Sequence, residues 1–317
     1  MKRIALFAAA LAFAGAALAQ YPERPIRIIV PFGPGGFTDV AARILQKELA
    51  PALGQSIIIE NKPGAGSTIG TAEVSKAKPD GYTLVMVSTT HVISPHLYRQ
   101  MPYDALRDFT PVMKLAEGPY VLVVHPSLNV KTVGELIAAA RREPGKIDYA
   151  SSGNGSAQHL VGALFTTMAN ANLNHVPYKG SNQAMNDVVG GQVKVSFVGV
   201  PNALPNLNSG KLKALGVSTR KRYAELPDVP TIEEAGVPGY DATVWLGLLA
   251  PPGTPREIVQ KLSTEITKVL SSAEARRLMA SAGVDVAASS PEDFAKLLKS
   301  EHDRWGKVVK ETGAQVN

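Results

Sequence analysis

The chain has 317 residues, of which 45% are hydrophobic and 19% charged, and its formal net charge is +6. This length and composition are typical of a globular protein with one large or two medium domains. The sequence contains no cysteine, which excludes disulfides, a cysteine nucleophile, thiolate metal sites and a lipid-anchored cysteine.

The N-terminal segment, residues 1–19, has the pattern of a secretory signal peptide. It has a basic start at Lys2 and Arg3, an apolar run from Ile4 to Leu18, and small residues before a cleavage site at Ala19. The run is shorter than the roughly 20 residues that a membrane span needs. We therefore expect export with cleavage near Ala19, and the loss of Lys2 and Arg3 takes the net charge from +6 to +4. Without a basic run or aromatic stacking motif, nucleic acid is not an expected partner.

Short apolar runs alternate with helical patterns through most of the remaining chain. The expected strands are Ile26–Val30, Ile57–Glu60, Tyr82–Val87, Tyr120–Val124, Ile147–Ala150, Asn174–Pro177, Lys194–Val198, Leu212–Val217 and Val244–Leu249. The expected helices are Asp39–Leu53, Thr68–Lys76, Val133–Arg142, Ala157–Ala169 and Asn182–Val189. This alternation predicts an α/β fold with mostly parallel strands, and their number indicates two sheets.

The C-terminal segment differs, because the pattern from Pro255 to Thr312 is nearly all helical. Ile258, Leu262 and Ile266 recur at helical spacing and predict one apolar face. We expect this segment to cap one domain and to close the chain back onto it.

Two glycine-rich loops each stand between a strand and a helix. The first runs from Pro31 to Thr38, and the second from Ser151 to Ser156. Glycines let backbone amides approach a ligand closely, and each helix N-terminus behaves as about half a positive charge. Two such ends facing one cleft suit a carboxylate and need no lysine. The alternative is that both are ordinary strand-to-helix turns.

Phosphate motifs are not supported. Gly145-Lys146, Gly210-Lys211 and Gly306-Lys307 lack the Ser or Thr that completes a Walker motif. The dinucleotide pattern fails after Gly153, because Gln158 occupies the third glycine position.

Asp39 stands beside the first loop, where a carboxylate would repel an anionic ligand. We expect Asp39 to brace the loop through backbone amides, or to pair with Arg43 one helical turn later. Direct contact between Asp39 and the ligand is the less favoured alternative.

Enzyme signatures are weak. No G-x-S-x-G nucleophile elbow is present, and the six histidines form no zinc motif. Ser156 and His159 lie three residues apart and could form a serine–histidine pair, but the favoured explanation is helix capping by Ser156 and hydrogen bonding by His159. His91 follows a strand and could face a cleft or pack inside a loop. We expect no catalytic residue, no metal and no cofactor.

Several segments together resemble the Bug-type solute receptors, the substrate-binding proteins of tripartite tricarboxylate transporters. The segments that carry the resemblance are Tyr21–Ile26, Val30–Asp39, Glu60–Gly66, Pro79–Leu84, Tyr149–His159, His175–Gly180, Leu226–Thr231 and Ala250–Pro255. The resemblance spans nearly the whole mature chain.

This resemblance implies a type II-like periplasmic binding protein: two α/β domains, a two-strand hinge and a ligand cleft between the domains. Domain 1 would comprise residues 21–122 and 241–317, and domain 2 residues 123–240. The two loops would hold a carboxylate through backbone amides, hydroxyls and water. The implied ligand-binding residues are Phe32, Gly33, Gly35, Gly36, Phe37 and Thr38 on one side, and Ser151, Gly153, Ser156 and His159 on the other. Ser88, His91, Tyr178 and Val200 are candidates for contacts with the far end of the ligand.

The implied function is a periplasmic receptor, expected to be a monomer, that delivers a small organic carboxylate to a membrane permease without chemistry. The alternatives are an exported hydrolase using Ser156 and His159, or a sensory ligand-binding subunit. One departure from the family pattern bears on the ligand: Val198 follows Phe197 where many members carry an aspartate. An amino-acid ligand, whose ammonium would need a carboxylate, is therefore less expected.

Overall fold

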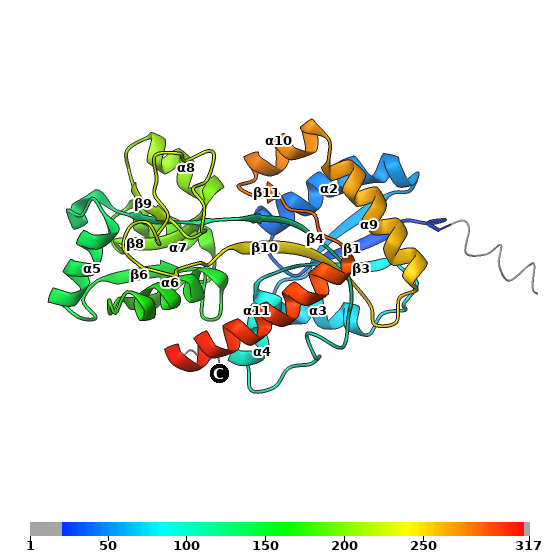
Figure 1. Ribbon diagram of the computed structural model, residues 1–317, viewed down its shortest axis with the longest axis horizontal. Coiled ribbons are helices and arrows are strands. Elements are labelled where there is room, and N and C mark those ends of the chain that lie inside the picture. Colours follow the sequence, from blue (N-terminus) through cyan, green and yellow to red (C-terminus); the bar gives the residue numbers. More distant parts are fainter. Residues whose placement is uncertain (1–20, 314–317) are drawn as a thin grey trace, which may run out of the picture.

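The computed structural model describes residues 21–313 and shows two mixed β-sheets with helices packed on their faces (Figure 1). The predicted signal peptide lies outside the described residues. The fold is α/β, as predicted. The first sheet has the order β11-β4-β10-β3-β1-β2, and the second has the order β7-β6-β8-β5-β9.

In the first sheet β1 pairs in parallel with β2 and β3, whereas β10 pairs antiparallel with β3 and β4, and β11 pairs antiparallel with β4. Its strands are β1 Ile26–Val30, β2 Ile57–Asn61, β3 Thr83–Ser88, β4 Thr110–Gly118, β10 Val244–Ala250 and β11 Asp285–Val286. The second sheet consists of β5 Tyr120–Val124, β6 Asp148–Ser151, β7 Asn174–Pro177, β8 Val195–Gly199 and β9 Lys213–Val217. Strands β6, β7 and β8 pair in parallel, whereas β5 pairs antiparallel with both β8 and β9.

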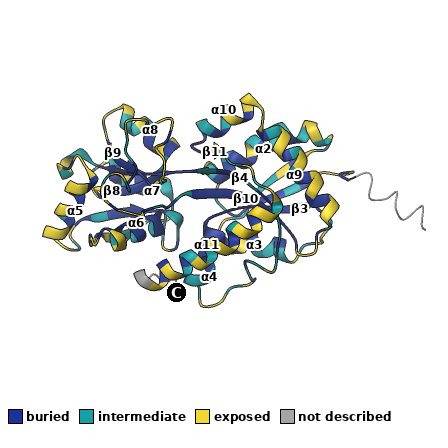
Figure 2. Ribbon diagram, viewed as in Figure 1, coloured by how far each residue is buried: buried dark blue, intermediate teal, exposed yellow. Residues whose placement is uncertain are grey.

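The helices bury one face against these sheets and expose the other (Figure 2). They are α2 Phe37–Leu53, α3 Thr68–Ser75, α4 Thr90–Leu97, α5 Val133–Arg142, α6 Ala157–Met168, α7 Ser181–Val189, α8 Val200–Asn208, α9 Arg256–Leu270, α10 Ala273–Ser281 and α11 Pro291–Thr312, with short 3₁₀ turns at Ala65–Ser67 and Pro126–Leu128. On α9 the predicted apolar face is buried, with Leu262 and Ile266 fully inaccessible. Within residues 21–313, none of these helices has the length and apolar character needed to cross a bilayer.

The structure corrects one prediction about the elements. The sheets are mixed rather than mostly parallel, because the strands that connect the two sheets join them antiparallel. The C-terminal segment is nearly all helical, as predicted, and the short strand β11 within it, which pairs with β4, was not predicted. Strand β4 and helices α4 and α8 were not predicted; both helices contain an internal proline, at Pro95 and Pro205.

The chain passes between the sheets twice, and one serine ties the two passages together. The first passage leads from β4 through Pro119 into β5, and the second leads through Ala242 into β10 (Figure 1). The Ser218 hydroxyl accepts from the backbone N–H of Tyr120 at 2.9 Å and donates to the Ala242 carbonyl at 3.0 Å. Two adjacent crossing strands are the expected form of a hinge. The domain boundaries given above remain a prediction.

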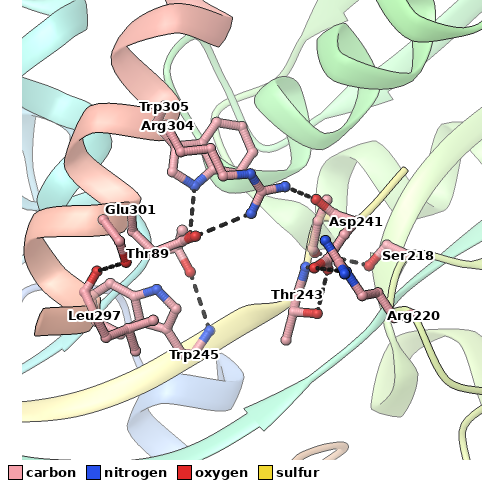
Figure 3. Close-up of polar contacts among 12 residues, drawn as sticks. Thr89, Ser218, Arg220, Asp241, Thr243, Trp245, Leu297, Glu301, Arg304 and Trp305 are labelled. Carbon is pink, nitrogen blue, oxygen red and sulfur yellow. Dashed lines mark hydrogen bonds and ion pairs between the residues drawn. The ribbon is translucent and has the colours of Figure 1, made fainter. Parts of the chain in front are cut away.

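Helix α11 fastens this crossing from one side (Figure 3). Glu301 accepts from the Trp305 indole N–H at 3.0 Å and from the Arg304 guanidinium at 3.1 Å. The same guanidinium donates to the backbone carbonyl of Asp241 in the second passage. The Asp241 carboxylate in turn accepts from Arg220 at 3.0 Å. Helix α11 also packs against α4 and α6, and therefore touches elements that lie on both sides of the crossing.

We expect Glu301→Ala to lower the free energy of unfolding by about 1–3 kcal/mol, because it leaves the buried Trp305 indole N–H without its acceptor. Urea denaturation measures the change. Lys299→Ala is the matched control on the same helix, since its ion pair with Asp303 is exposed and should contribute less than about 1 kcal/mol. Equal effects of the two substitutions would contradict the importance of the Glu301 contacts.

Candidate functional site

The first loop connects β1 to α2; its glycines are exposed, and the Asp39 carboxylate at the start of α2 is buried. Residues 33–36 are exposed, whereas Asp39 is only 2% exposed. One oxygen of Asp39 accepts from the Gly35 N–H and from Arg43 Nε, each at 3.0 Å, and the other accepts from the Asn61 amide at 2.8 Å. Burial opposes ionisation of Asp39, but these hydrogen bonds outweigh it and hold its pKa below the ordinary value. Its carboxylate is therefore occupied within the loop.

Several amides of the first loop have no partner inside the protein. The backbone N–H groups of Gly33, Phe37 and Thr38 donate no hydrogen bond within residues 21–313. The last two belong to the first turn of α2, where N–H groups have no intrahelical acceptor. Phe32 and Phe37 are partly buried against the core, and the Phe37 ring stands edge-on to Tyr120 at 6.3 Å between centroids. The loop thus offers unpartnered backbone N–H groups, while Asp39 and the partly buried Phe32 and Phe37 hold it in place.

We expect Asp39→Asn to lower the free energy of unfolding by about 1.5–3 kcal/mol, because hydrogen bonds to a charged acceptor are lost at a buried position. The lowered pKa means that this stabilisation is present above about pH 4 and is lost as the pH falls through the folded-state value. Urea denaturation at several pH values measures it. Arg43→Gln, which removes a half-exposed partner, should cost less than about 1 kcal/mol; a larger loss than for Asp39→Asn would contradict the brace.

The second loop, residues 151–156, directs most of its polar groups inward. Ser156 caps α6 by accepting the His159 N–H at 3.2 Å, and the Gly155 N–H donates to His159 Nδ1 at 3.1 Å. The Gly153 N–H donates to the buried Ser151 hydroxyl at 3.1 Å. Gly153 has φ of +128°, and a Cβ there would lie 3.0 Å from the Tyr178 carbonyl, so the position requires glycine. The predicted side chains of Ser151, Ser156 and His159 therefore hold the loop.

Three amides of the second loop lack internal partners. The N–H groups of Asn154, Ala157 and Gln158 donate no hydrogen bond within the described part of the chain. Sequence reasoning missed these residues, because it selected side chains with polar atoms rather than backbone positions. The signal available in the sequence was the N-cap at Ser156, which leaves the next two N–H groups free.

A small cavity lies between the two sheets beside the start of α2. Its volume is about 10 Å³, room for about one water molecule. The lining is mostly apolar and includes Phe37, Pro119, Tyr120, Val200 and Val244. On one side Gly283 approaches Pro201 so closely that a Cβ would lie 2.4 Å from the proline ring, which brings the segment after α10 against the start of α8.

Among the remaining predicted residues, Ser88, Tyr178 and Val200 belong to neither loop. The Ser88 hydroxyl contacts the Thr90 hydroxyl at 2.9 Å and is buried. The Tyr178 hydroxyl donates to Asp187 at 2.7 Å, and the Tyr178 backbone N–H donates to the Ser151 carbonyl at 3.0 Å. Val200 lines the cavity, whereas Val198 is buried among the valines of the second sheet.

His91 is 1% exposed, and its Nε2 bonds to the Ala105 carbonyl at 2.9 Å. The ring is stacked on Tyr103 at 5.8 Å between centroids, so it faces the interior of the first sheet's helical layer. Burial lowers the pKa of His91 to about 4. The loop-packing alternative describes this histidine better than contact with a ligand.

His91→Gln should make stability less sensitive to acid. The unfolded chain binds a proton at about pH 6.5 and the folded chain only near pH 4, so wild-type stability falls as the pH decreases between these values. The full contribution is about 3 kcal/mol. Gln keeps a donor for the Ala105 carbonyl but cannot be protonated. Parallel pH profiles of unfolding free energy for the two proteins would contradict this assignment.

The geometry does not favour hydrolysis. The Ser156 oxygen accepts the His159 N–H and His159 Nδ1 accepts the Gly155 N–H, and within residues 21–313 no hydrogen bond joins the two side chains. Within residues 21–313 there is also no group of three or more His, Asp or Glu residues placed to hold a metal ion. What the loops offer is a set of backbone donors, which suits binding of an anion.

Two mixed sheets, a double crossing between them and strand–helix loops at the crossing define a two-domain periplasmic binding protein. The sequence pattern described as "Tripartite tricarboxylate transporter family receptor" (TctC) matches residues 41–314. The chain belongs to this family, whose members are substrate-binding receptors.

Comparisons with individual proteins agree. BugT of Bordetella pertussis is 37% identical over 298 residues, which cover 93% of this chain and 91% of BugT. The structure of R. palustris Rpa4515 with adipate has 38% identity and a TM-score of 0.86, covering 93% of this chain and 100% of that one. MatC from Rhodopseudomonas palustris with bound malate has 34% identity and a TM-score of 0.82, covering 91% and 100%.

Proposed function

We propose that this protein is a periplasmic receptor that captures a small organic dicarboxylate between its two strand–helix loops. The observation that carries the proposal is the pair of helix starts with unpartnered amides, at Phe37 and Thr38 on α2 and at Ala157 and Gln158 on α6. Each start also bears the positive end of a helix dipole. Relatives that bind adipate and malate support a dicarboxylate.

The available donors are sufficient for useful affinity. A micromolar complex requires about 8 kcal/mol of binding free energy. A hydrogen bond to a charged group contributes roughly 1.5–3 kcal/mol, so four or five amide contacts can supply that amount and offset part of the ordering cost. No arginine or lysine in the loops is needed.

The apolar cavity supports a ligand with a hydrocarbon segment. Phe37 contributes both a free amide at the helix start and a ring in the cavity wall, so a bound carboxylate and its attached methylenes would meet adjacent surfaces. The cavity holds about one water molecule, so a diacid would fit in this space only with the two domains further apart. Motion at the double crossing then closes the domains over the ligand and shifts an open–closed equilibrium.

The liganded receptor delivers its cargo to the membrane permease of a tripartite tricarboxylate-type transporter and performs no chemistry on it. We place the protein in the periplasm as a monomer, exported by the signal peptide that the sequence predicts. The two domains are taken as residues 21–122 with 241–317, and residues 123–240.

A thermal-shift screen of the mature chain tests the ligand class. Adipate, malate, a tricarboxylate and an aromatic acid are compared, and at least one diacid should raise the melting temperature with the concentration dependence of mass action. At 100 times Kd the stabilisation is about 2.7 kcal/mol.

The matched control is adipamide, which keeps the length of adipate but replaces both carboxylates by neutral amides. It should give no shift at equal concentration, because helix-end amides favour an anion. Stabilisation by neutral sugars or cations and by no carboxylate would overturn the proposed function. Hydrolysis of ester substrates abolished by Ser156→Ala would overturn the absence of chemistry.

A further inference from the structure

Two stacked imidazoles, those of His159 and His175, form hydrogen bonds with the second loop. His159 lies in the first turn of α6 and His175 on β7, and their rings are 3.9 Å apart between centroids with an interplanar angle of 14°. His159 Nδ1 accepts the Gly155 N–H at 3.1 Å. His175 Nε2 forms a hydrogen bond with the Ser151 hydroxyl at 2.6 Å. Each ring thus holds a different end of the loop by one particular nitrogen.

The Ser151 hydroxyl links His175 to Gly153, because it forms hydrogen bonds with both residues. It accepts the Gly153 N–H at 3.1 Å, and its oxygen lies 3.2 Å from the Gly153 carbonyl. A hydroxyl has one proton, so it either donates to His175 Nε2 or receives from Nε2–H and donates to that carbonyl. In both arrangements the chain His175–Ser151–Gly153 is continuous.

The surroundings keep both rings neutral and fixed. Burial lowers the pKa of His159 to about 4, and burial together with the neighbouring His159 lowers that of His175 to about 3. Tyr149 packs on His175 at 5.0 Å, and its hydroxyl donates to the His159 carbonyl at 3.2 Å. Within residues 21–313 neither ring has an ion pair or hydrogen bond to a carboxylate.

We propose that His175, which lies outside both loops, is a positioning residue for ligand binding. Through Ser151, and through its stacking on His159, it fixes residues 151–156 so that the free amides of Asn154 and Ala157 face the ligand. The inference rests on the proposed function of this loop as one side of a carboxylate site. It assigns a role to the histidine of the His175–Gly180 segment, which sequence analysis used only as a mark of resemblance.

The two nitrogens allow a matched set of substitutions. An asparagine side chain places its oxygen near the position of Nδ1, and a glutamine side chain places its amide near that of Nε2. His159→Asn should therefore keep an acceptor for the Gly155 N–H, and His175→Gln should keep the bond to Ser151. The exchanged pair, His159→Gln and His175→Asn, has similar polarity but puts the polar group at the wrong distance.

Amide hydrogen exchange measured by NMR without ligand is the first readout. Relative to wild type, His175→Asn should accelerate exchange of the Gly153 amide at least tenfold, and His159→Gln should do the same for Gly155. His159→Asn and His175→Gln should stay within about threefold. Ser151→Ala, which keeps both imidazoles, should reproduce the Gly153 effect even where a histidine variant is too unstable to study.

Affinity for the adipate or malate probe, measured by calorimetry, is the second readout. The mismatched variants should weaken Kd at least tenfold, while the matched variants stay within threefold. Equal exchange and equal affinity in all four histidine variants would overturn the proposal, because packing alone would then explain the pair. If neither diacid binds wild type, the proposed function fails, yet the amide exchange still decides whether His175 holds the loop.

Discussion

The structure depends on one constraint: a backbone N–H removed from water must find an acceptor, and the first turn of a helix supplies none. At both strand–helix loops some backbone donors find acceptors within residues 21–313 and others do not. The Asp39 carboxylate accepts the Gly35 N–H, and the His159 ring accepts the Gly155 N–H. The donors that follow at the helix starts remain without internal partners. In the proposed site an anion would complete the set, so a carboxylate could be bound there without a lysine or arginine.

The two loops reach the same result by different chemistry. The first is held by an ionised aspartate whose negative charge is balanced by Arg43 at 3.0 Å, so it does not present a bare charge to an anionic ligand. The second is held by two neutral imidazoles, which bring no charge. In both cases the groups that shape the loop add no net charge, so the attraction for an anionic ligand would come from the dipoles at the helix N-termini. In the proposed site, recognition of a carboxylate would then depend on the geometry of the amides as much as on charge.

Sequence reasoning located both loops, because prolines, glycines and the capping residue Ser156 mark strand–helix turns in a local pattern. It did not find β4, which contains Pro111 and a Lys114–Glu117 ion pair and is placed by pairing with the distant β10. It also could not assign direction to polar groups. Whether the Ser151 hydroxyl points to solvent or to His175 depends on β7, a strand that no local pattern connects to the loop.

The crossing between the sheets sets what the loops can do. If the domains part to admit a diacid, rotation has to occur where the two passages lie side by side, near Ser218 and Ala242. Helix α11 holds this region through the Arg304 contact to the Asp241 carbonyl, and Asp241 itself is tied to Arg220 (Figure 3). Rotation about the crossing strands would therefore have to keep or break these hydrogen bonds. If the unpartnered amides of the two loops are to meet on one ligand, as proposed, rotation about this crossing is the motion that brings them together, and the α11 contacts would then act in the same binding event as the loop amides.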